Sequence, residues 1–212
     1  KEEVAKLNYK PRLLIIQIEG DRASDSYVKN KMKLGAELGL KVGHQLLPSN
    51  ITQRELEIYI KAMNESSYDG IIVQLPLPKH IDERAVLELI DPKKDVDGLT
   101  DINRGMLLSG MDGLYPCTAL GIMELIKRYN ISVGGRRVVI VGRSLLVGKP
   151  VSMMLLNNDA TVTICHSKTE NLKDITKSAD ILIVAVGKAN FITDDMIRDD
   201  VVVIDVGINR TV

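Results

Sequence analysis

Short apolar runs alternate with segments of helical period along the whole chain. The apolar runs are rich in Val, Ile and Leu, which is typical of buried β-strands. We predict such strands at residues 13–18, 42–47, 70–75, 138–141, 161–164, 181–184 and 201–204. The segments between them predict helices at residues 26–40, 52–63, 82–90, 118–129, 148–156 and 171–178.

This order of elements indicates an α/β protein. Near-continuous Val/Ile strands separated by helices imply parallel sheets that are covered on both faces. Two groups of strands joined by one helix predict two α/β domains whose parallel sheets flank a cleft, the second domain being Rossmann-like. We place the boundary so that residues 1–117 form the first domain and residues 118–212 the second.

Local sequence patterns add detail to two of the predicted helix starts and to one long segment between predicted elements. Thr52 followed by Glu55 has the spacing of a capping box and predicts a helix start. Thr118 is expected to cap the helix that joins the domains. Residues 91–116 are rich in Gly, Asp and Asn and weakly periodic, so we interpret them as a long functional loop plus connector.

Composition narrows the class of protein. The 28 basic and 28 acidic residues give a formal net charge of zero, and aromatic residues are 3% of the chain, which disfavours nucleic acid as a partner. Two distant cysteines form neither a disulfide framework nor a metal site, which favours a reducing compartment. No apolar run is long enough to cross a membrane and no signal-peptide core is present, so we expect a soluble cytoplasmic protein.

The first predicted strand of the second domain leads into a glycine turn and then a helix. Gly142 opens the turn and Gly148 starts the helix, an arrangement that presents free amides and a positive helix end to a pyrophosphate. The spacing departs from the standard G-x-G-x-x-G because Ser144 stands where the middle glycine is expected. A plain strand-to-helix turn with no ligand remains the alternative.

The next strand suggests which dinucleotide would bind. A site for NAD usually ends this strand with an acidic residue, which holds the ribose 2′-hydroxyl. Here the strand is followed by His166, Ser167 and Lys168, with Arg143 expected nearby, and this set suits a 2′-phosphate. NADP is therefore favoured, although a solvated loop explains His166 or Lys168 taken singly.

Polar residues gather at predicted strand ends of the first domain. Tyr27 and Lys31 lie four apart and so share one helix face, although such a pair is more often simply solvent-exposed. Gln74 ends a strand, and Asp97 lies in the long loop. A partly desolvated lysine is a candidate acid/base group, and a carboxylate can accept hydrogen bonds from an amino-substituted heterocycle. The sequence shows no metal-ligand cluster.

Five motifs then occur in one order along the chain. They are Y-x-x-x-K at residues 27–31, VQLPLP at 73–78, KDVDG at 94–98, PCT at 116–118 and GRSLLVGKP at 142–150. The set covers essentially the whole chain and closely resembles the bifunctional methylenetetrahydrofolate dehydrogenase/cyclohydrolase family, often called FolD.

The resemblance implies two coupled reactions. In the first, 5,10-methylenetetrahydrofolate gives a hydride to NADP and becomes 5,10-methenyltetrahydrofolate. In the second, water opens the methenyl bridge to give 10-formyltetrahydrofolate, which serves one-carbon metabolism and purine biosynthesis. The first domain would bind the folate and carry the catalytic residues, and the second would bind NADP.

The same resemblance implies roles for individual residues of the first domain. Lys31 would be the acid/base of the hydrolysis, and Gln74 would position and tune it. Tyr27 would stack on the folate. Asp97 would hold the pterin end, with Asp95 a weaker candidate.

For the cofactor, the resemblance implies that Arg143 and Ser167 contact the 2′-phosphate, with Ser144 and His166 close by. The other predicted cofactor-binding residues are Gly142, Val147, Gly148, Gly187 and Ile208. The family is typically a homodimer formed through the cofactor domains, so we expect the same here.

Two features depart from the family pattern. Ala119 stands where Pro is usual, a change that a helix start tolerates. The pattern normally continues beyond residues 207–210 with a further strand region, a Pro-Gly-Gly-Val loop and a helix on the first domain, and the N-terminal helix looks shortened. We therefore expect the sequence to be incomplete.

Three other interpretations remain open. A monofunctional dehydrogenase would have no need of both Lys31 and Gln74. A non-catalytic NADP-binding module would leave the polar residues of the first domain unexplained. A shikimate-type dehydrogenase shares the two-domain plan but would not be expected to carry the motifs at residues 73–78 and 94–98.

Overall fold

The computed structural model describes residues 1–207, without the side chains of residues 22 and 23. The chain divides into two compact units, Lys1–Asn103 and Arg104–Val212. Each unit contains one parallel sheet, as the sequence predicts. Within the described residues, no helix combines the length and apolar character that crossing a membrane requires.

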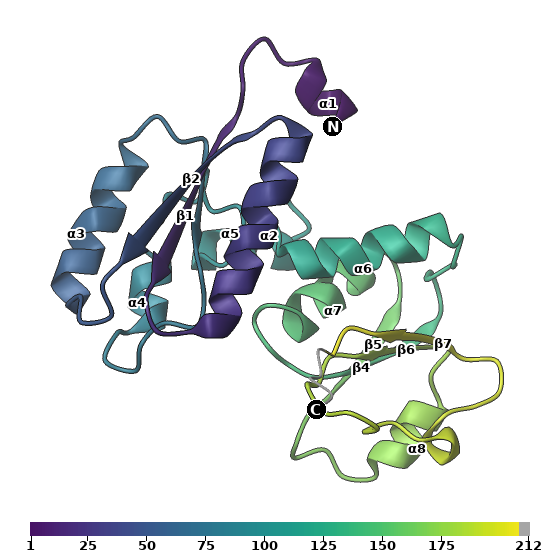
Figure 1. The fold of residues 1–212 in the computed structure, drawn as a ribbon. Coiled ribbons are helices and arrows are strands. Elements are labelled where there is room, and N and C mark those ends of the chain that lie inside the picture. The colour runs from purple at the N-terminus through teal and green to yellow at the C-terminus, as the bar shows by residue number, and fades with distance from the viewer. Residues whose placement is uncertain (208–212) are drawn as a thin grey trace. The chain divides into compact units, whose positions relative to one another are not determined.

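The sheet of the first unit has three strands in the order β2-β1-β3. They are β1 (Arg12–Ile18), β2 (Lys41–Leu47) and β3 (Gly70–Val73), and all pair in parallel. The helices of this unit are α1 (Glu2–Ala5), α2 (Arg22–Leu38), α3 (Gln53–Asn64) and α4 (Glu83–Leu87). Figure 1 shows α2 on one face of the sheet and α3 with α4 on the other.

Alternate residues of β1 contribute to two different apolar layers. Leu14 and Ile16 pack in a buried cluster with Leu56 of α3. Ile15, between them, packs with Val28 of α2. Because successive strand residues point to opposite faces, helices on both faces require the continuous apolar run that the sequence shows.

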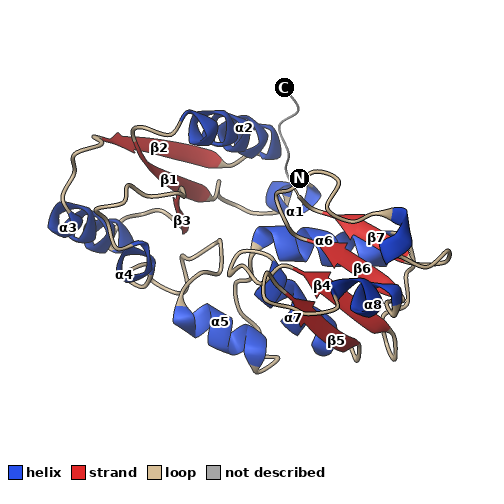
Figure 2. Ribbon diagram, turned by 90° about the horizontal axis from the view of Figure 1, so that it is seen from below, coloured by secondary structure: helices blue, strands red, loops and turns tan. Residues whose placement is uncertain are grey.

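The sheet of the second unit has four parallel strands in the order β5-β4-β6-β7, seen side by side in Figure 2. They are β4 (Arg137–Val141), β5 (Thr161–Cys165), β6 (Ile181–Val184) and β7 (Val202–Asp205). The helices are α6 (Cys117–Arg128), α7 (Gly148–Leu156), α8 (Leu172–Lys177) and the short 3-10 helix η1 (Asp194–Met196). A further helix, α5 (Asp101–Leu108), spans the division between the units.

This sheet is also covered on both faces (Figure 1). Ile140 of β4 belongs to a buried cluster with Ile122 of α6 and Leu155 of α7. The next residue towards the N-terminus, Val139, lies in the opposite layer, against which Ile175 of α8 packs. The core thus repeats the arrangement of the first unit.

The predicted elements are largely confirmed. All seven predicted strands are present, with ends that move by two residues or fewer. Helix α7 begins and ends where the sequence indicates, whereas α2 begins four residues before the predicted start. The capping box is also confirmed, because the Thr52 hydroxyl accepts from the Glu55 amide at 3.3 Å and the Glu55 carboxylate accepts from the Thr52 amide at 2.8 Å.

The segment at residues 91–116 differs from the predicted loop, because it contains helix α5. The helix is short and has Gly105 near its middle, so its periodicity is weak in the sequence. Leu107, in its last turn, is buried in the core of the second unit. This packing places the division between Asn103 and Arg104, where the sequence suggested a boundary after residue 117.

The predicted cap at Thr118 is wrong. Helix α6 begins at Cys117 with Pro116 as its N-cap residue, and no side chain caps it. Pro116 has a φ of −55°, fixed by its ring, and its carbonyl accepts from the Leu120 amide at 3.0 Å. The proline therefore starts the helix one residue before the threonine.

Candidate active site and cofactor cradle

Helix α2 carries Tyr27 and Lys31 one turn apart, as the sequence predicts. The Lys31 Nζ donates a hydrogen bond of 3.1 Å to the Oε1 of Gln74, which follows β3. Lys31 is half-buried, whereas Tyr27 is 44% exposed. An exposed ring on the same helix face is available to cover a flat ligand beside the lysine.

Gln74 is held by two further contacts, one through its main chain and one through its side chain. Its main-chain amide donates to the carbonyl of Ile16 at 2.8 Å, which continues the pairing of β3 with β1. Its Nε2 donates to the carbonyl of Leu75 at 2.8 Å. Because the amide nitrogen is used in this way, the amide oxygen faces Lys31.

Ser24 lies close to the same strand end, but it does not cap α2. Its amide and hydroxyl donate to the Asp21 carboxylate at 3.0 Å and 2.7 Å, so Asp21 is the capping residue. The Ser24 hydroxyl also lies 3.3 Å from the carbonyl of Leu75, where it can donate. This contact links the start of α2 to the peptide that holds the Gln74 amide.

The two carboxylates of the loop after α4 have different environments. Asp95 is 1% exposed, and its Oδ2 accepts from the Thr100 amide at 2.8 Å and from the Asn103 side chain at 2.9 Å. Asp97 is half-buried and lies near Lys31. Burial raises the pKa of the Asp97 carboxyl, the positive charge of Lys31 lowers it, and Asp95 raises it further. Asp97 is thus the carboxylate that interacts electrostatically with Lys31.

The glycine turn of the second unit follows β4. Gly142 has a φ of +129°, and a Cβ there would lie 2.6 Å from the carbonyl oxygen of Ala185. A Cβ on Gly148 would meet the main chain of Gly142. Both positions therefore require glycine, and the close approach brings the start of α7 next to the end of β4. A strand end, a tight turn and a helix start form the cradle that a pyrophosphate needs.

Ser144 accepts hydrogen bonds from main-chain amides within this turn. Its hydroxyl accepts from the amides of Val147 at 3.1 Å and Gly148 at 3.4 Å. Its carbonyl accepts from the Lys149 amide at 3.0 Å. Ser144 therefore holds the turn in shape at the position where a glycine is standard.

A second tight turn follows β5. The His166 amide donates to the Thr169 hydroxyl at 2.8 Å, and the His166 Nδ1 accepts from the Lys168 amide at 3.2 Å. In this contact Nδ1 acts as the acceptor, which leaves Nε2 as the nitrogen that faces away from the turn amide. Ser167 and, in the neighbouring turn, Arg143 are exposed. A hydroxyl and a guanidinium near the ends of adjacent strands fit a phosphate group.

Of the remaining predicted cofactor residues, Gly187 lies at the same edge of the sheet. Gly187 follows β6 and is exposed, and Gly207 follows β7. Ile208 lies outside the described residues. Carboxyl ends of parallel strands on either side of β4 form the crevice in which α/β proteins bind nucleotides. Within residues 1–207, no group of three or more His, Cys, Asp or Glu residues could hold a metal ion.

Three polar residues with defined contacts were missed by the sequence reasoning. Asp21 caps α2, Thr169 closes the turn after β5, and Asn64 fastens the loop that leads to Asp97. Asp21 stands three residues before Ser24, which is the spacing of a helix cap, so it was detectable. Asn64 and Thr169 act through distant or turn contacts that no spacing rule indicates.

These features define a class of protein: an α/β enzyme with a nucleotide-binding unit and a separate polar site built around a lysine. The catalytic-domain model of tetrahydrofolate dehydrogenase/cyclohydrolase matches residues 1–97, and the NAD(P)-binding-domain model matches residues 116–212. The chain belongs to the tetrahydrofolate dehydrogenase/cyclohydrolase family.

Individual relatives agree with this assignment. A bifunctional protein FolD of Campylobacter concisus is 50% identical over 210 residues, which are 99% of this chain and 74% of that protein. The crystal structure of the FolD enzyme of Campylobacter jejuni matches with a TM-score of 0.96 and 44% identity, covering 99% of this chain and 75% of that one. A FolD of Trypanosoma brucei, solved with NADP and an inhibitor, matches with a TM-score of 0.91 and 38% identity, covering 97% and 73%.

Proposed function

We propose that this enzyme oxidises 5,10-methylenetetrahydrofolate to 5,10-methenyltetrahydrofolate with NADP and hydrolyses the product to 10-formyltetrahydrofolate. The family assignment supports both activities and the cofactor. The observation that carries the hydrolysis is the 3.1 Å contact between the Lys31 Nζ and the Gln74 Oε1, next to Asp97. A dehydrogenase alone would have no use for a positioned acid/base group, because hydride transfer needs none.

For the hydrolysis, we assign to Lys31 the transfer of one proton in each direction. Its neutral amine takes a proton from water as the water oxygen bonds to the methenyl carbon. As the bond from this carbon to N5 breaks, the Lys31 ammonium returns a proton to N5. The hydroxyl oxygen left by the attacking water forms the carbonyl and loses its own proton to solvent, so the hydrolysis releases one proton overall. Gln74 keeps the Nζ in place without adding a charge, so the amine remains able to accept the proton.

Tyr27 and Asp97 orient the folate in this proposal. The exposed ring of Tyr27 stacks on the pterin, and the carboxylate of Asp97 accepts hydrogen bonds from its amino group. Together they hold the one-carbon bridge near Lys31, where proximity accounts for much of the rate.

When bound, NADP supplies the hydride acceptor for the first reaction. The tight turn between Gly142 and Gly148 would hold its pyrophosphate at the start of α7. Arg143 and Ser167 would hold the 2′-phosphate, and His166 would lie near the cofactor. These residues fit an anionic dinucleotide for two reasons. The glycines let the phosphates approach the main chain closely, and the exposed Arg143 and Ser167 can donate hydrogen bonds to an anion.

We further propose that the enzyme is a cytoplasmic homodimer joined through its cofactor units, and that its product supplies purine biosynthesis. An exposed apolar edge supports the dimer, because β5 ends the described sheet and leaves Ile164 36% exposed. Leu108 and Leu145 are exposed as well and line the same apolar groove as Ile164. Light scattering after size exclusion measures the mass, and a mass of one chain at micromolar concentration contradicts this part of the proposal.

One assay tests the activities. The purified chain is mixed with 5,10-methylenetetrahydrofolate and NADP, and in parallel with NAD, and the methenyl absorbance is followed. We expect a rise with NADP and then a decay. A rise without decay indicates a monofunctional dehydrogenase, and no rise with either cofactor indicates a non-catalytic module.

A further inference from the structure

The loop that carries Asp97 is fastened to the C-terminal end of α3 by contacts that the proposed function does not use. The Lys94 Nζ donates to the carbonyl of Asn64 at 2.6 Å and to that of Ser66 at 2.9 Å. Carbonyls at the end of a helix lack partners within it, and a positive charge there is favourable. The ammonium group of Lys94 is thus bound to the helix end, while its backbone belongs to the loop.

The side chain of Asn64 makes two more contacts across the same junction. Its Oδ1 accepts from the amide of Asp91 at 2.9 Å, and its Nδ2 donates to the carbonyl of Leu89 at 2.7 Å. Asn64 therefore joins the end of α3 to the start of the loop, and Lys94 joins it to the middle. Together, Lys94 and Asn64 form what we call the α3 clamp.

The main chain of the loop is also paired with β3. The carbonyl of Lys94 accepts from the amide of Ile71 at 2.7 Å, and Asp95 forms an isolated parallel bridge with Ile71. Val96 packs so closely over Gly70 that a Cβ there would lie 2.6 Å from the Val96 Cγ1. These contacts hold residues 94–96 of the loop against the start of β3.

The turn that follows this anchored segment carries Asp97. The Gly98 amide donates to the Asp95 carbonyl at 3.0 Å, which closes the turn around Val96 and Asp97. Val96 packs in the apolar layer under α2, while the Asp95 carboxylate accepts from Thr100 and Asn103. The position of Asp97 therefore depends on where Lys94 is anchored.

We propose that Lys94 and Asn64 are positioning residues for folate binding, acting through Asp97. The α3 clamp holds the loop in the conformation that presents the Asp97 carboxylate to Lys31. This inference rests on the proposed function, since the ligand that it positions is a tetrahydrofolate.

The test compares two neighbouring lysines on the full chain. Lys94→Met keeps most of the side-chain length and removes the ammonium, and Lys93→Met makes the same change at an exposed position. We expect Lys94→Met to weaken tetrahydrofolate binding, measured by calorimetry, and to raise the KM for folate in both reactions, each by about 10-fold or more. The KM for NADP and the properties of Lys93→Met should stay within about twofold of the wild type, because substitutions at exposed positions usually change free energies by no more than about 0.5 kcal/mol, or about twofold in affinity.

A double-mutant cycle separates positioning from general weakening of the fold. If Lys94 acts through Asp97, adding Lys94→Met to Asp97→Asn changes tetrahydrofolate affinity by less than about twofold. Lys94→Arg, which keeps a cation at the helix end, should recover part of the affinity lost in Lys94→Met. Asn64→Ala should reproduce the loss of folate affinity, and its thermal unfolding is measured alongside.

The outcomes distinguish the α3 clamp from the proposed function. Equal tetrahydrofolate affinity in the wild type and Lys94→Met, or additive effects of Lys94→Met and Asp97→Asn, overturns the α3 clamp and leaves the proposed function untouched. A lower unfolding temperature without a change in folate affinity also overturns it. A wild type that binds tetrahydrofolate but turns over neither substrate contradicts the proposed function alone, and a wild type that does not bind it overturns both.

Discussion

The Nζ of Lys31 donates to the Oε1 of Gln74 at 3.1 Å across 43 residues of sequence. The contact joins α2 to the end of β3, and the Leu75 carbonyl fixes the orientation of the glutamine amide. A carboxylate in place of the amide would stabilise the ammonium form of Lys31. Gln74, being neutral, holds the lysine without adding a second negative charge to that of Asp97, which suits a group that must both accept and return a proton.

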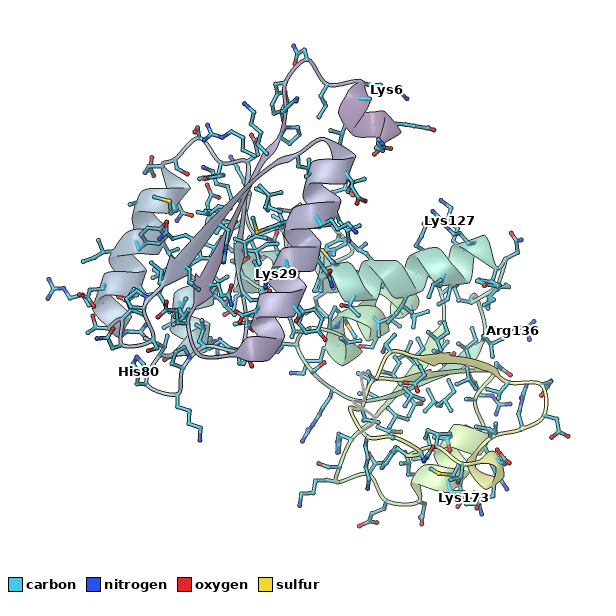
Figure 3. The ribbon with its side chains drawn as sticks, in the orientation of Figure 1. Lys6, Lys29, His80, Lys127, Arg136 and Lys173 are labelled. Atoms are coloured by element: carbon cyan, nitrogen blue, oxygen red, sulfur yellow. The ribbon has the colours of Figure 1, made fainter. Side chains whose placement is uncertain are left out.

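Replacing Lys31 with Met should abolish hydrolysis. Removing a general acid/base group typically costs about 10²- to 10⁴-fold in rate, and we expect a loss in this range in the decay of methenyl absorbance. The control is Lys29→Met on the same helix, labelled in Figure 3, because Lys29 is exposed and two residues away, on another face. Hydrolysis by Lys31→Met at the wild-type rate would show that another group transfers the proton.

Replacing Gln74 with Glu tests the neutrality of the partner. The new carboxylate would lie about 3 Å from the Lys31 Nζ and favour its charged form, which opposes proton uptake from water. We expect hydrolysis to fall by about 10²-fold or more and to recover in part as the pH rises. Unchanged hydrolysis with an unchanged pH profile contradicts the role given to Gln74.

Much of the fold was readable from the sequence because each strand is buried on both faces. A run such as Leu14, Ile15 and Ile16 must serve two apolar layers, so its hydrophobicity is continuous and its position unambiguous. Helix α5 was missed for the opposite reason: it is short, contains Gly105, and is held by the core contact of Leu107. Such a contact depends on tertiary structure and leaves little periodicity.

The candidate site was readable only where residues form local patterns. Tyr27 and Lys31 share a helix face by spacing alone, whereas the pairing of Lys31 with Gln74 depends on how β3 lies beside β1. The sequence also could not rank Asp95 and Asp97 by chemistry, because two carboxylates two residues apart differ only in their surroundings. Burial of Asp95 against Thr100 and Asn103 supplies that distinction.

Folate binding should depend on pH through Asp97. Burial raises the pKa of this carboxyl from 3.8, so as pH falls it takes up a proton earlier than an exposed aspartate would. Protonation removes the charge that binds the folate amino group, and affinity should fall on the acidic side. The positive charge of Lys31 lowers the pKa of Asp97, so Lys31→Met should move this loss to higher pH. Calorimetric titration with tetrahydrofolate across the acidic range measures both.

The control for this pH effect is Asp97→Asn, which cannot ionise. Its affinity should be low and flat over the range in which the wild type changes. An acidic loss that persists in Asp97→Asn, or that moves to lower pH in Lys31→Met, would assign the titration to another group.

Alanine variants of Ser144 and Ser167 should distinguish a residue that maintains the conformation of the turn from one that contacts the cofactor directly. Ser144→Ala removes the acceptor of the Val147 and Gly148 amides, and losing a hydrogen bond of this kind costs about 1 kcal/mol of stability. We expect a lower unfolding temperature and a higher KM for NADP. Ser167→Ala, at an exposed position, should raise the KM for NADP with no change in unfolding temperature. Identical behaviour of the two variants contradicts this division.

Arg143 should set the preference for NADP over NAD. Its exposed guanidinium lies in the turn after β4, and a hydrogen bond to a charged group contributes about 1.5–3 kcal/mol. Arg143→Ala should therefore lower the ratio of kcat/KM for NADP to that for NAD by about 10- to 100-fold, mainly through KM for NADP. Arg136→Ala is the matched control, because Arg136 is exposed just before the start of β4, at the opposite edge of the sheet (Figure 3). An equal loss with both cofactors in Arg143→Ala would mean that the guanidinium holds the shared pyrophosphate, and the 2′-phosphate would then have to be recognised by the turn at residues 166–169 alone.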